Sequence, residues 1–470
     1  MKTVFEKVFQ LSKHKTTAKT EVMAGITTFM TMAYILAVNP SVLSAAGMDA
    51  TAVLLATALS SFIGTACMAL MANLPFALSA GMGLNAFLAY TVVLGMGYTW
   101  QVALLAVFVE GLIFVVLSLT NVREAIFNAI PLTLKKGVSV GIGLFIAFIG
   151  LQNAGIVMDD GATLVNLASF NVFSGAATWA SIFPMLLTII AVFAIGAMSK
   201  KKVKGAVLWG MLGGAVLYYV IGLITIPDFY ATAVAPNLTS DFFSAFKEFG
   251  AQAFGKVFTE GFNFAPYVEA HGVANTVLTI ATTALAFCMV DMFDTIGTLY
   301  GACARGNMLT KDGEVPNMDK AMLADAIATT TGAICGTSTV TTFVESSSGV
   351  AEGGRTGLSS MVTALMFLVA MFLSPVAQLV PGCATAAALI YVGVLMMNCV
   401  KDIKWLDATE AVPAFLTLAI MPFAYNISYG ICFGLLSYVV INLCTGKAKN
   451  IKAGTWVITA LFVAMLLLTH

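Results

Sequence analysis

Apolar stretches of about 20 residues recur along the chain from Val22 to Leu468, separated by short polar breaks. A helix needs about 20 mostly apolar residues to cross a bilayer. The stretches are continuous rather than alternating in polarity, which indicates helices and not the strands of a membrane β-barrel. The pattern therefore predicts an all-α integral membrane protein with many spans.

The predicted spans follow these apolar stretches. In the first half of the chain they cover 22–42, 51–72, 76–97, 101–120, 137–156, 178–197 and 205–226. In the second half they cover 274–300, 320–336, 338–350, 357–378 and 382–400. The last stretch, 411–469, is interrupted by polar residues and holds either two spans or three.

The positions of Lys and Arg give these spans a direction. Basic residues lie before the first span, after the fourth and after the sixth, whereas the long segment 227–273 contains few of them. Cytoplasmic loops are enriched in Lys and Arg, so the N-terminus is expected in the cytoplasm. Seven spans precede the long segment, and an odd number gives the second half the opposite orientation. This arrangement is typical of the inverted repeats of secondary transporters.

Composition changes the picture in two respects. Only 10% of the residues are charged and 59% are hydrophobic, whereas soluble domains carry roughly 25% charged residues. The net charge is zero, so a nucleic-acid partner is not expected. The eight cysteines form no CxxC pair and the three histidines form no HExxH motif, so we expect neither a metal site nor a cofactor.

Two stretches within the spans do not favour a helix. Residues 337–344 are mostly β-branched or hydroxyl-bearing, and Glu345 follows them at a sequence suited to a helix N-terminus. In the first half, Pro75 precedes the helix-poor stretch 79–83. Extended backbone at membrane depth is tolerated only where protein buries it or where it lines a cavity. We expect two short strands that lead into two half-helices facing one central site. The alternative is a pair of ordinary loops just outside the membrane.

Five acidic residues fall inside predicted spans: Glu110, Asp291, Asp294, Asp325 and Glu345. A charge at bilayer depth costs at least ~2.5 kcal/mol, so each of them is a candidate for function. Asp291 and Asp294 share one helix face, and Glu345 lies at the expected strand-to-helix junction. These three carboxylates suit a neutral ligand rich in N–H donors, with a proton as the coupling ion. Glu110 and Asp325 are expected to be scaffold residues that hydrogen-bond neighbouring helices.

Three separated motifs give the sequence a family resemblance. They are SAGMGLNAF at 79–87, FCMVDMFDTIGTL at 287–299 and TTFVESSSGVAEGGRTG at 341–357. They resemble signatures of the AzgA-like hypoxanthine–guanine permeases, within the nucleobase:cation symporter-2 (nucleobase–ascorbate transporter) superfamily. The wider superfamily has Asn-x-Gly after the acidic position of segment 10. Here Ser346 follows Glu345, which favours the AzgA-like branch.

The resemblance implies about fourteen membrane segments in two inverted seven-segment repeats of the UraA-like fold, with segments 3 and 10 broken by strands. It also implies a core domain that moves against a gate domain. The implied division is a cytoplasmic segment 1–21, core halves 22–120 and 274–378, gate halves 121–226 and 379–470, and an external loop 227–273.

The resemblance also implies that Asn85, Asp291, Asp294 and Glu345 serve the substrate and the coupling ion. The candidate substrate site adds Gly83 and Gly349, which occupy matching positions when the two broken segments are laid against each other. Asp291, Asp294 and Glu345 are the candidates for proton coupling. Phe293, Phe343 and Tyr34 are candidates for stacking on a purine, although aromatic residues in membrane bundles more commonly pack. Gly297 and Gly301 are expected to allow close helix packing.

Together these features predict proton-coupled uptake of purine nucleobases by an elevator-type mechanism. Hypoxanthine and guanine rank first because their N1–H can donate to a carboxylate, and adenine lacks that donor. The expected partners are the nucleobase, the lipid bilayer and, from the resemblance alone, a second copy of the chain in a homodimer. The alternatives are a permease for adenine or another nucleobase, an anion exchanger of the same architecture, a membrane-embedded enzyme and a channel.

Overall fold

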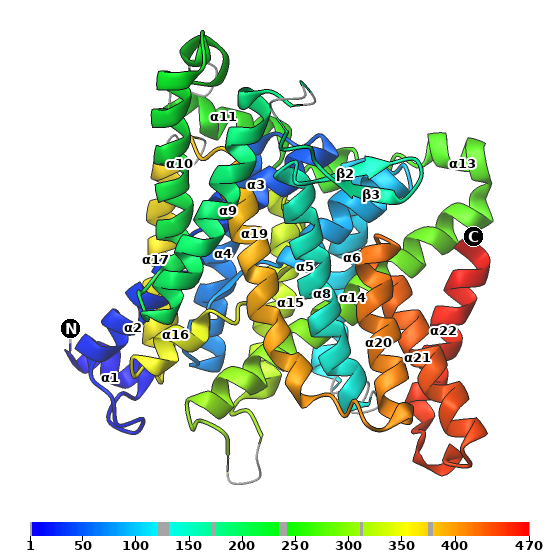
Figure 1. Ribbon diagram of the computed structural model, residues 1–470. Coiled ribbons are helices and arrows are strands. Elements are labelled where there is room, and N and C mark those ends of the chain that lie inside the picture. The colour runs from blue at the N-terminus through cyan, green and yellow to red at the C-terminus, as the bar shows by residue number, and fades with distance from the viewer. Residues whose placement is uncertain are drawn as a thin grey trace.

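The computed structural model describes residues 2–120, 131–171, 175, 177–234, 242–310, 314–374 and 379–469. It is a bundle of helices that run mostly side by side (Figure 1). Within the described ranges, nine helical stretches are long and apolar enough to cross a membrane, and four shorter apolar helices accompany them. The predicted many-span helical architecture is confirmed.

Most of the long helices follow the predicted spans, whereas α1 precedes the first of them and α5 and α16 cover only parts of the two broken ones. Those of the first half are α1 (Lys2–Phe9), α2 (Ala18–Met32), α3 (Ile35–Leu43), α4 (Ala50–Cys67), α5 (Met82–Ala86), α6 (Trp100–Leu119), α8 (Leu132–Asn153), α9 (Trp179–Lys200) and α10 (Ala206–Thr225). Those of the second half are α14 (Val273–Arg305), α15 (Met318–Cys335), α16 (Ser346–Ala351), α17 (Gly357–Ala370), α19 (Gly382–Met396), α20 (Ala408–Phe423), α21 (Ile427–Cys444) and α22 (Ala453–Thr469). The C-terminal stretch thus holds three helices rather than two.

Several helices begin at side-chain caps that the sequence supplies. The carboxylate of Asp49 accepts a hydrogen bond from the backbone N–H of Ala52 at the start of α4. The amide oxygen of Asn426 accepts from the N–H of Ser428 at the start of α21. Such caps satisfy backbone donors that have no partner within the helix, so they fix where each span starts.

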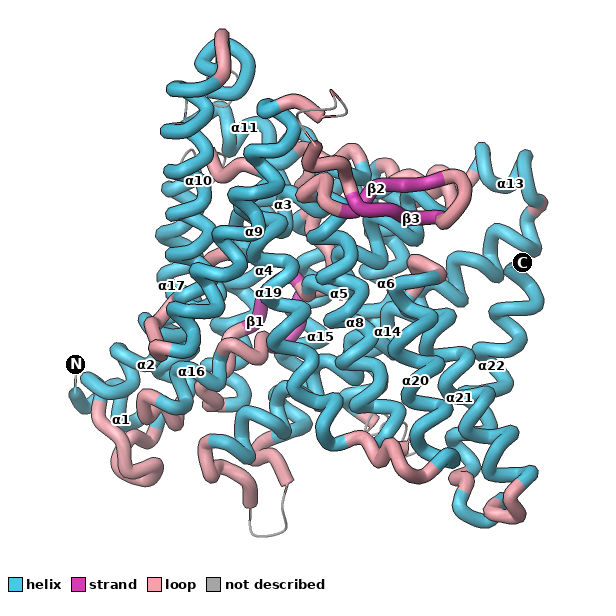
Figure 2. The backbone as a smooth tube through the Cα atoms, in the orientation of Figure 1, coloured by secondary structure: helices cyan, strands magenta, loops and turns pink. Residues whose placement is uncertain are grey.

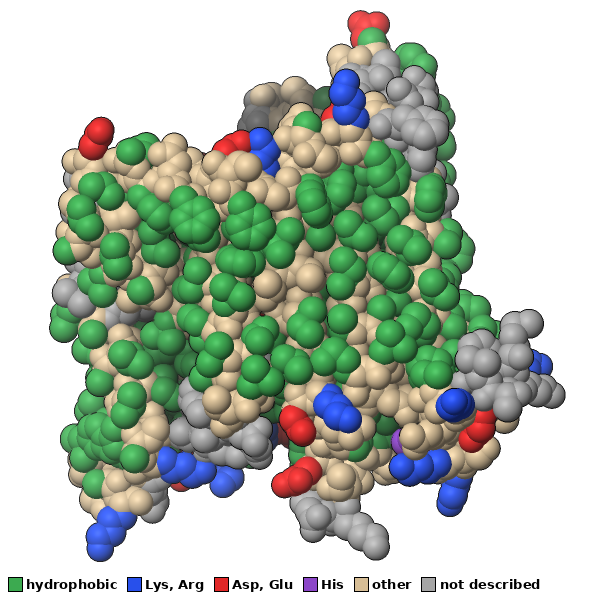
Figure 3. Space-filling model, turned by 180° about the vertical axis from the view of Figure 1, so that it is seen from behind, with side chains coloured by type: hydrophobic (Ala, Val, Ile, Leu, Met, Phe, Trp, Pro, Cys, Tyr) green, Lys and Arg blue, Asp and Glu red, His purple; other side chains and the backbone are tan. Residues whose placement is uncertain are grey.

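The surface has the polarity of a membrane protein. On the face seen in Figure 3, apolar side chains cover the middle of the bundle and charged side chains gather at the two rims, with Lys and Arg mainly along the lower one. Large apolar side chains such as Phe193 and Ile224 are exposed. An apolar surface of this extent suits contact with lipid.

Two strands lie in the middle of the bundle. β1 (Leu78–Ala80) pairs antiparallel with β4 (Val340–Thr342), with Ser79 opposite Thr341. Both strands are fully buried, at mid-height among the helices and away from the hairpin of β2 (Val157–Asp160) and β3 (Leu164–Leu167) at the rim (Figure 2). The alternative of ordinary loops outside the membrane is therefore wrong. The predicted strands form because each satisfies the other's backbone at a depth where water is absent.

The helices pack mainly in two groups. One group comprises α2, α4, α6, α14, α15 and α17, and the two central strands pack with it. The other comprises α8, α9, α10, α19, α20 and α21. α22 packs against α21 of the second group and against α14 of the first.

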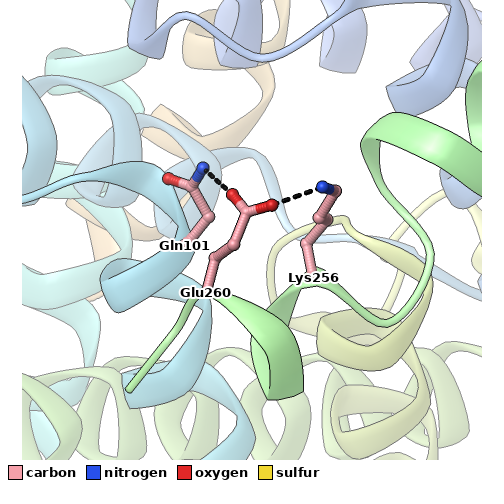
Figure 4. A network of polar contacts seen from close by, with 3 residues as sticks. All are labelled: Gln101, Lys256 and Glu260. Atoms are coloured by element: carbon pink, nitrogen blue, oxygen red, sulfur yellow. Dashed lines mark hydrogen bonds and ion pairs between the residues drawn. The ribbon is translucent and has the colours of Figure 1, made fainter. Parts of the chain in front are cut away.

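The segment between α10 and α14 contains helices rather than a plain loop: α11 (Phe242–Gln252), α12 (Lys256–Thr259) and α13 (Ala265–His271). Glu260, after α12, accepts hydrogen bonds from Lys256 and from the amide of Gln101 on α6, the latter at 2.8 Å (Figure 4). The hydrogen bond from Lys256, followed by that from Gln101, lowers the pKa of the Glu260 carboxyl. The contact with Gln101 ties this segment to the first group of helices.

Candidate functional site

The two central strands lead directly into two half-helices. β1 is followed by Gly81 in extended conformation and then by α5, and β4 is followed by Glu345 immediately before α16. A π-helical stretch, Phe87–Gly95, continues α5 through the bundle. Because the strands are antiparallel, the two half-helices begin at opposite ends of one short ladder. The backbone thus brings segments 3 and 10, which are far apart in sequence, to one place.

Glu345 is held by a tyrosine of the first span. The hydroxyl of Tyr34 donates to Oε1 of Glu345 at 2.6 Å. Tyr34 is 1% exposed and lies at the interruption between α2 and α3, whereas Glu345 is partly exposed. The sequence indicated Tyr34 only as a candidate for stacking. Its role as a hydrogen-bond donor was missed, and the available signal was a phenol inside an otherwise apolar span.

Asp291 and Asp325 meet at one threonine. The hydroxyl of Thr295 lies 3.2 Å from Oδ1 of Asp291, 2.9 Å from Oδ1 of Asp325 and 2.6 Å from the hydroxyl of Thr341 on β4. All four side chains are fully buried or nearly so. Asp325, predicted to be scaffolding, therefore lies beside the site residue Asp291 and reaches the central strand through the same hydroxyl.

Asp294 completes the acidic region. It lies on α14, three residues after Asp291, and its side chain is partly exposed, unlike that of Asp291. Asp325 and Glu345 both lie close enough to act electrostatically on the Asp294 carboxyl. The structure thus brings together the three predicted carboxylates and adds Asp325. Such a group of acids can accept N–H donors and can exchange a proton.

Asn85 belongs to a buried amide network. Its Nδ2 donates to Oδ1 of Asn39 at 2.5 Å, and Asn39 donates in turn to the hydroxyls of Thr57 (2.7 Å) and Thr337 (2.9 Å). All four residues are fully buried. The network ties α5 to α3, to α4 and to the segment that leads into β4. The amide oxygen of Asn85 has no hydrogen-bond partner within the part of the chain that the structure describes. Asn39 was missed because nothing in its local sequence marks it.

The glycines of the candidate site are packing positions. A Cβ at Gly349 would overlap the hydroxyl of Thr28 and lie 2.8 Å from the carbonyl oxygen of Ala24, so α16 lies directly on α2. A Cβ at Gly83 would lie 2.6 Å from Cγ2 of Ile142 on α8. At both positions, therefore, only a residue without a side chain allows the two segments to approach this closely.

The expectation of close packing at Gly297 and Gly301 is wrong. A Cβ at either position meets no atom within 4 Å among the described residues. Among the described residues, therefore, no neighbouring segment packs against these glycines.

The remaining candidates have mixed outcomes. Glu110 accepts a hydrogen bond from the hydroxyl of Thr339 at 2.8 Å, next to β4, which suits a scaffold role. Phe343 is buried in the main core, and its N–H donates to the carbonyl of Ala77 at 3.0 Å. The side chain of Phe293 lies outside the described residues. Among the residues described, no group of three or more His, Cys, Asp or Glu is arranged to hold a metal ion.

The broken segments, the central strand pair and the membrane-buried acids define a class of protein, the membrane transporters of the UraA-like fold. A solved structure agrees: the transmembrane domain of a cyanobacterium bicarbonate transporter, BicA, superposes with a TM-score of 0.62 at 16% identity. That similarity covers 88% of this chain and 97% of that one, and it concerns the fold alone.

Sequence comparison gives the family. Residues 19–433 match the Xan_ur_permease model, described as "Permease family". The guanine/hypoxanthine permease PbuG of Bacillus subtilis is 40% identical over 98% of both chains. The adenine permease AdeP of Escherichia coli is 37% identical over 98% of this chain and 95% of its own. The chain belongs to this permease family, whose members are multi-pass membrane transport proteins and not enzymes.

Proposed function

We propose that the protein imports purine nucleobases, with hypoxanthine and guanine preferred, in symport with protons. The observation that carries the proposal is the group of carboxylates around the central strand pair, with Glu345 at the start of a half-helix and Asp294 partly exposed beside it. The names of the relatives support a nucleobase as the substrate class.

The chemistry of the site follows from its acceptors. A purine carries ring N–H groups, and a carboxylate that is ionised can only accept hydrogen bonds. Glu345 and one of the two α14 aspartates accept these donors. Neighbouring carboxylates at low dielectric repel each other when all are ionised. Protonation of one of them relieves this repulsion and so favours the state with substrate bound. Substrate and proton thereby bind in one region, where each can favour binding of the other.

Adenine is the second candidate substrate. It is favoured by the 37% identity to AdeP, which approaches the 40% identity to PbuG. The two candidates differ at N1, which is a donor in hypoxanthine and guanine and an acceptor in adenine. An ionised Glu345 favours the donor, whereas a protonated carboxyl group could serve either base.

An anion exchanger is the less favoured reading. The fold is shared with a bicarbonate transporter, but a fold does not determine a substrate. Carboxylates in the site would repel an anion. Arg355, the basic residue that follows α16, directs its guanidinium to the carbonyls of Val350 and Gly354 at 2.7 Å.

The packing of the helices supports alternating access of the elevator type. The central strands and the acidic residues belong to the first group of helices, and the second group forms a separate packing unit beside it. We infer that the first group, the core, carries the substrate past the second, the gate. We infer from the Lys-rich lower rim that the N-terminus faces the cytoplasm. The homodimer stays a prediction from the family resemblance.

One uptake experiment tests the proposal. The protein is expressed in cells that lack purine permeases, and entry of labelled hypoxanthine is measured against external pH and with a protonophore. We expect entry that rises at acidic pH, collapses with the protonophore and is competed by guanine. Glu345→Gln and Asp294→Asn should reduce entry more than tenfold, while Glu110→Gln, a matched removal of a buried charge, should retain it. Entry indifferent to the proton gradient would exclude symport, and stronger competition by adenine than by guanine would reverse the substrate ranking.

A further inference from the structure

Tyr34 lies where the first long apolar stretch is interrupted. α2 ends at Met32 and α3 begins at Ile35, which leaves Tyr34 as one of the two residues between them. A buried phenol usually finds a hydrogen-bond partner. Here the partner is the carboxylate of Glu345 on another span, 311 positions along the chain.

Backbone packing fixes the positions of both residues. α16 is pressed onto α2 through Gly349, where a Cβ would lie 2.8 Å from the carbonyl oxygen of Ala24. On its other side, Ser346 is tied to the first broken segment, because its hydroxyl accepts from the N–H of Ala77 at 2.9 Å. The main chain on both sides of the hydrogen bond is therefore held, and the 2.6 Å contact determines how the carboxylate is turned.

We propose that Tyr34 is a positioning residue for substrate recognition. Its hydroxyl holds Oε1 of Glu345, so that the remaining acceptor capacity of the carboxylate is directed to the N–H edge of the base. An ionised carboxylate offers about four lone-pair positions, and the phenol takes one of them. When Glu345 is ionised the bond is charge-assisted, and it then orients the acceptor more strongly than a neutral hydrogen bond would. This inference rests on the proposed function. In it Tyr34 acts through its hydroxyl on Glu345, whereas a stacking residue would act through its ring on the base.

The test compares two substitutions at one position. Tyr34→Phe keeps the aromatic ring and removes the hydroxyl, whereas Tyr34→Leu removes both. Tyr219→Phe is the matched control, since its hydroxyl donates to the backbone carbonyl of Leu379 at 2.9 Å in the other group of helices. KM and Vmax for hypoxanthine are measured in transport-deficient cells, with membrane abundance and the melting temperature of the purified protein recorded for each variant.

We expect Tyr34→Phe to raise KM about tenfold, equivalent to about 1.4 kcal/mol, with Vmax per molecule and melting temperature little changed. Tyr34→Leu should show the same rise in KM, and Tyr219→Phe should show none. A Tyr34→Phe variant with wild-type KM, combined with a defective Tyr34→Leu, would overturn the proposal in favour of a stacking or packing ring.

A double variant keeps the test decisive. In Glu345→Asp the carboxylate is retracted from Tyr34, so adding Tyr34→Phe to that background should cause no further rise in KM if the hydroxyl acts through Glu345. If the rises in KM caused by Tyr34→Phe and Glu345→Asp add up in the double variant, the proposal is overturned. It is also overturned if both Tyr34→Phe and the double variant fail to reach the membrane. Wild-type protein that takes up no purine would instead reject the proposed function, an outcome separate from these.

Discussion

The hydroxyl of Thr295 on α14 lies 2.9 Å from Oδ1 of Asp325 on α15, and it joins Asp325 to Asp291, which lies on α14 as well. One hydroxyl hydrogen thus faces two fully buried carboxyl groups, with a second hydroxyl supplied by Thr341. Carboxyl groups buried this far from water depend on the hydrogen bonds that they make, so the hydroxyl of Thr295 matters for the fold as well as for the site.

Thr295→Val should therefore be damaging. The change keeps the branched shape and removes the hydroxyl, so two buried carboxyl groups lose one of their hydrogen bonds, at a cost of about 1–3 kcal/mol. We expect a lower melting temperature of the purified protein and a loss of hypoxanthine uptake of more than fivefold. Thr295→Ser, which keeps the hydroxyl, serves as the control and should retain most of both. A valine variant with wild-type melting temperature and uptake would show that the hydroxyl is dispensable.

A methyl group at Gly349 tests how closely the second half-helix must lie on the first span. Gly349→Ala places its Cβ onto the hydroxyl of Thr28 and 2.8 Å from the Ala24 carbonyl, so α16 has to shift. Overpacking of this kind costs about 1–3 kcal/mol, and the shift moves Glu345. We expect uptake to fall at least tenfold at equal membrane abundance.

Gly297→Ala is the matched control for that change. It lies on α14, where the added Cβ meets no described atom within 4 Å. Replacing a helical glycine by alanine then favours the helix by roughly 0.5–1 kcal/mol. Uptake should be unchanged and the melting temperature equal or slightly higher. Equal damage from both alanine variants would contradict the packing role assigned to Gly349.

The sequence allowed the spans and the two breaks to be predicted because those features are local. Length and apolarity of a stretch determine whether it can cross the bilayer, and the β-branched run at Val340–Thr342 cannot easily be helical. The register of Ser79 with Thr341 is not local, because it pairs residues from the two halves of the chain, and the local sequence of neither strand specifies it.

The site was predictable to the level of its carboxylates and no further. Acids in a membrane span are conspicuous, so Asp291, Asp294 and Glu345 could be named. Their neutral partners could not, because a tyrosine or threonine in a span is unremarkable until a distant segment meets it. The contact of Tyr34 with Glu345 joins residues 311 positions apart. Gly297 shows the opposite error, in which a composition cue suggested packing where the fold leaves space.

Asn39 should be as sensitive as any residue of the acidic region. It holds three hydrogen bonds, to Asn85, Thr57 and Thr337, in a fully buried setting. Asn39→Leu leaves several buried polar groups unsatisfied, so we expect a loss of stability of about 2 kcal/mol or more. Thermal unfolding of the purified protein measures it. Asn398→Leu, which removes an exposed amide bonded only to the Leu395 carbonyl among described partners, is the control and should change stability by less than about 0.5 kcal/mol.

Glu260, in the segment between α10 and α14, offers a prediction about the pH dependence of stability. Its pKa is lowered in the folded protein, chiefly by the hydrogen bond from Lys256 and then by that from Gln101. A group with a lowered pKa adds stability above its unfolded-state pKa of about 4.3, and that stability is lost as the pH falls through the folded-state value. Glu260→Gln should therefore lower the melting temperature slightly at pH 7, and the difference from wild type should shrink below about pH 4. The side chain is 42% exposed, so solvent screening keeps the shift within about 2 °C. Glu248→Gln on α11, which removes a charge elsewhere on the same segment, is the control. A difference between wild type and Glu260→Gln that grows as the pH falls would contradict the assigned hydrogen bonds.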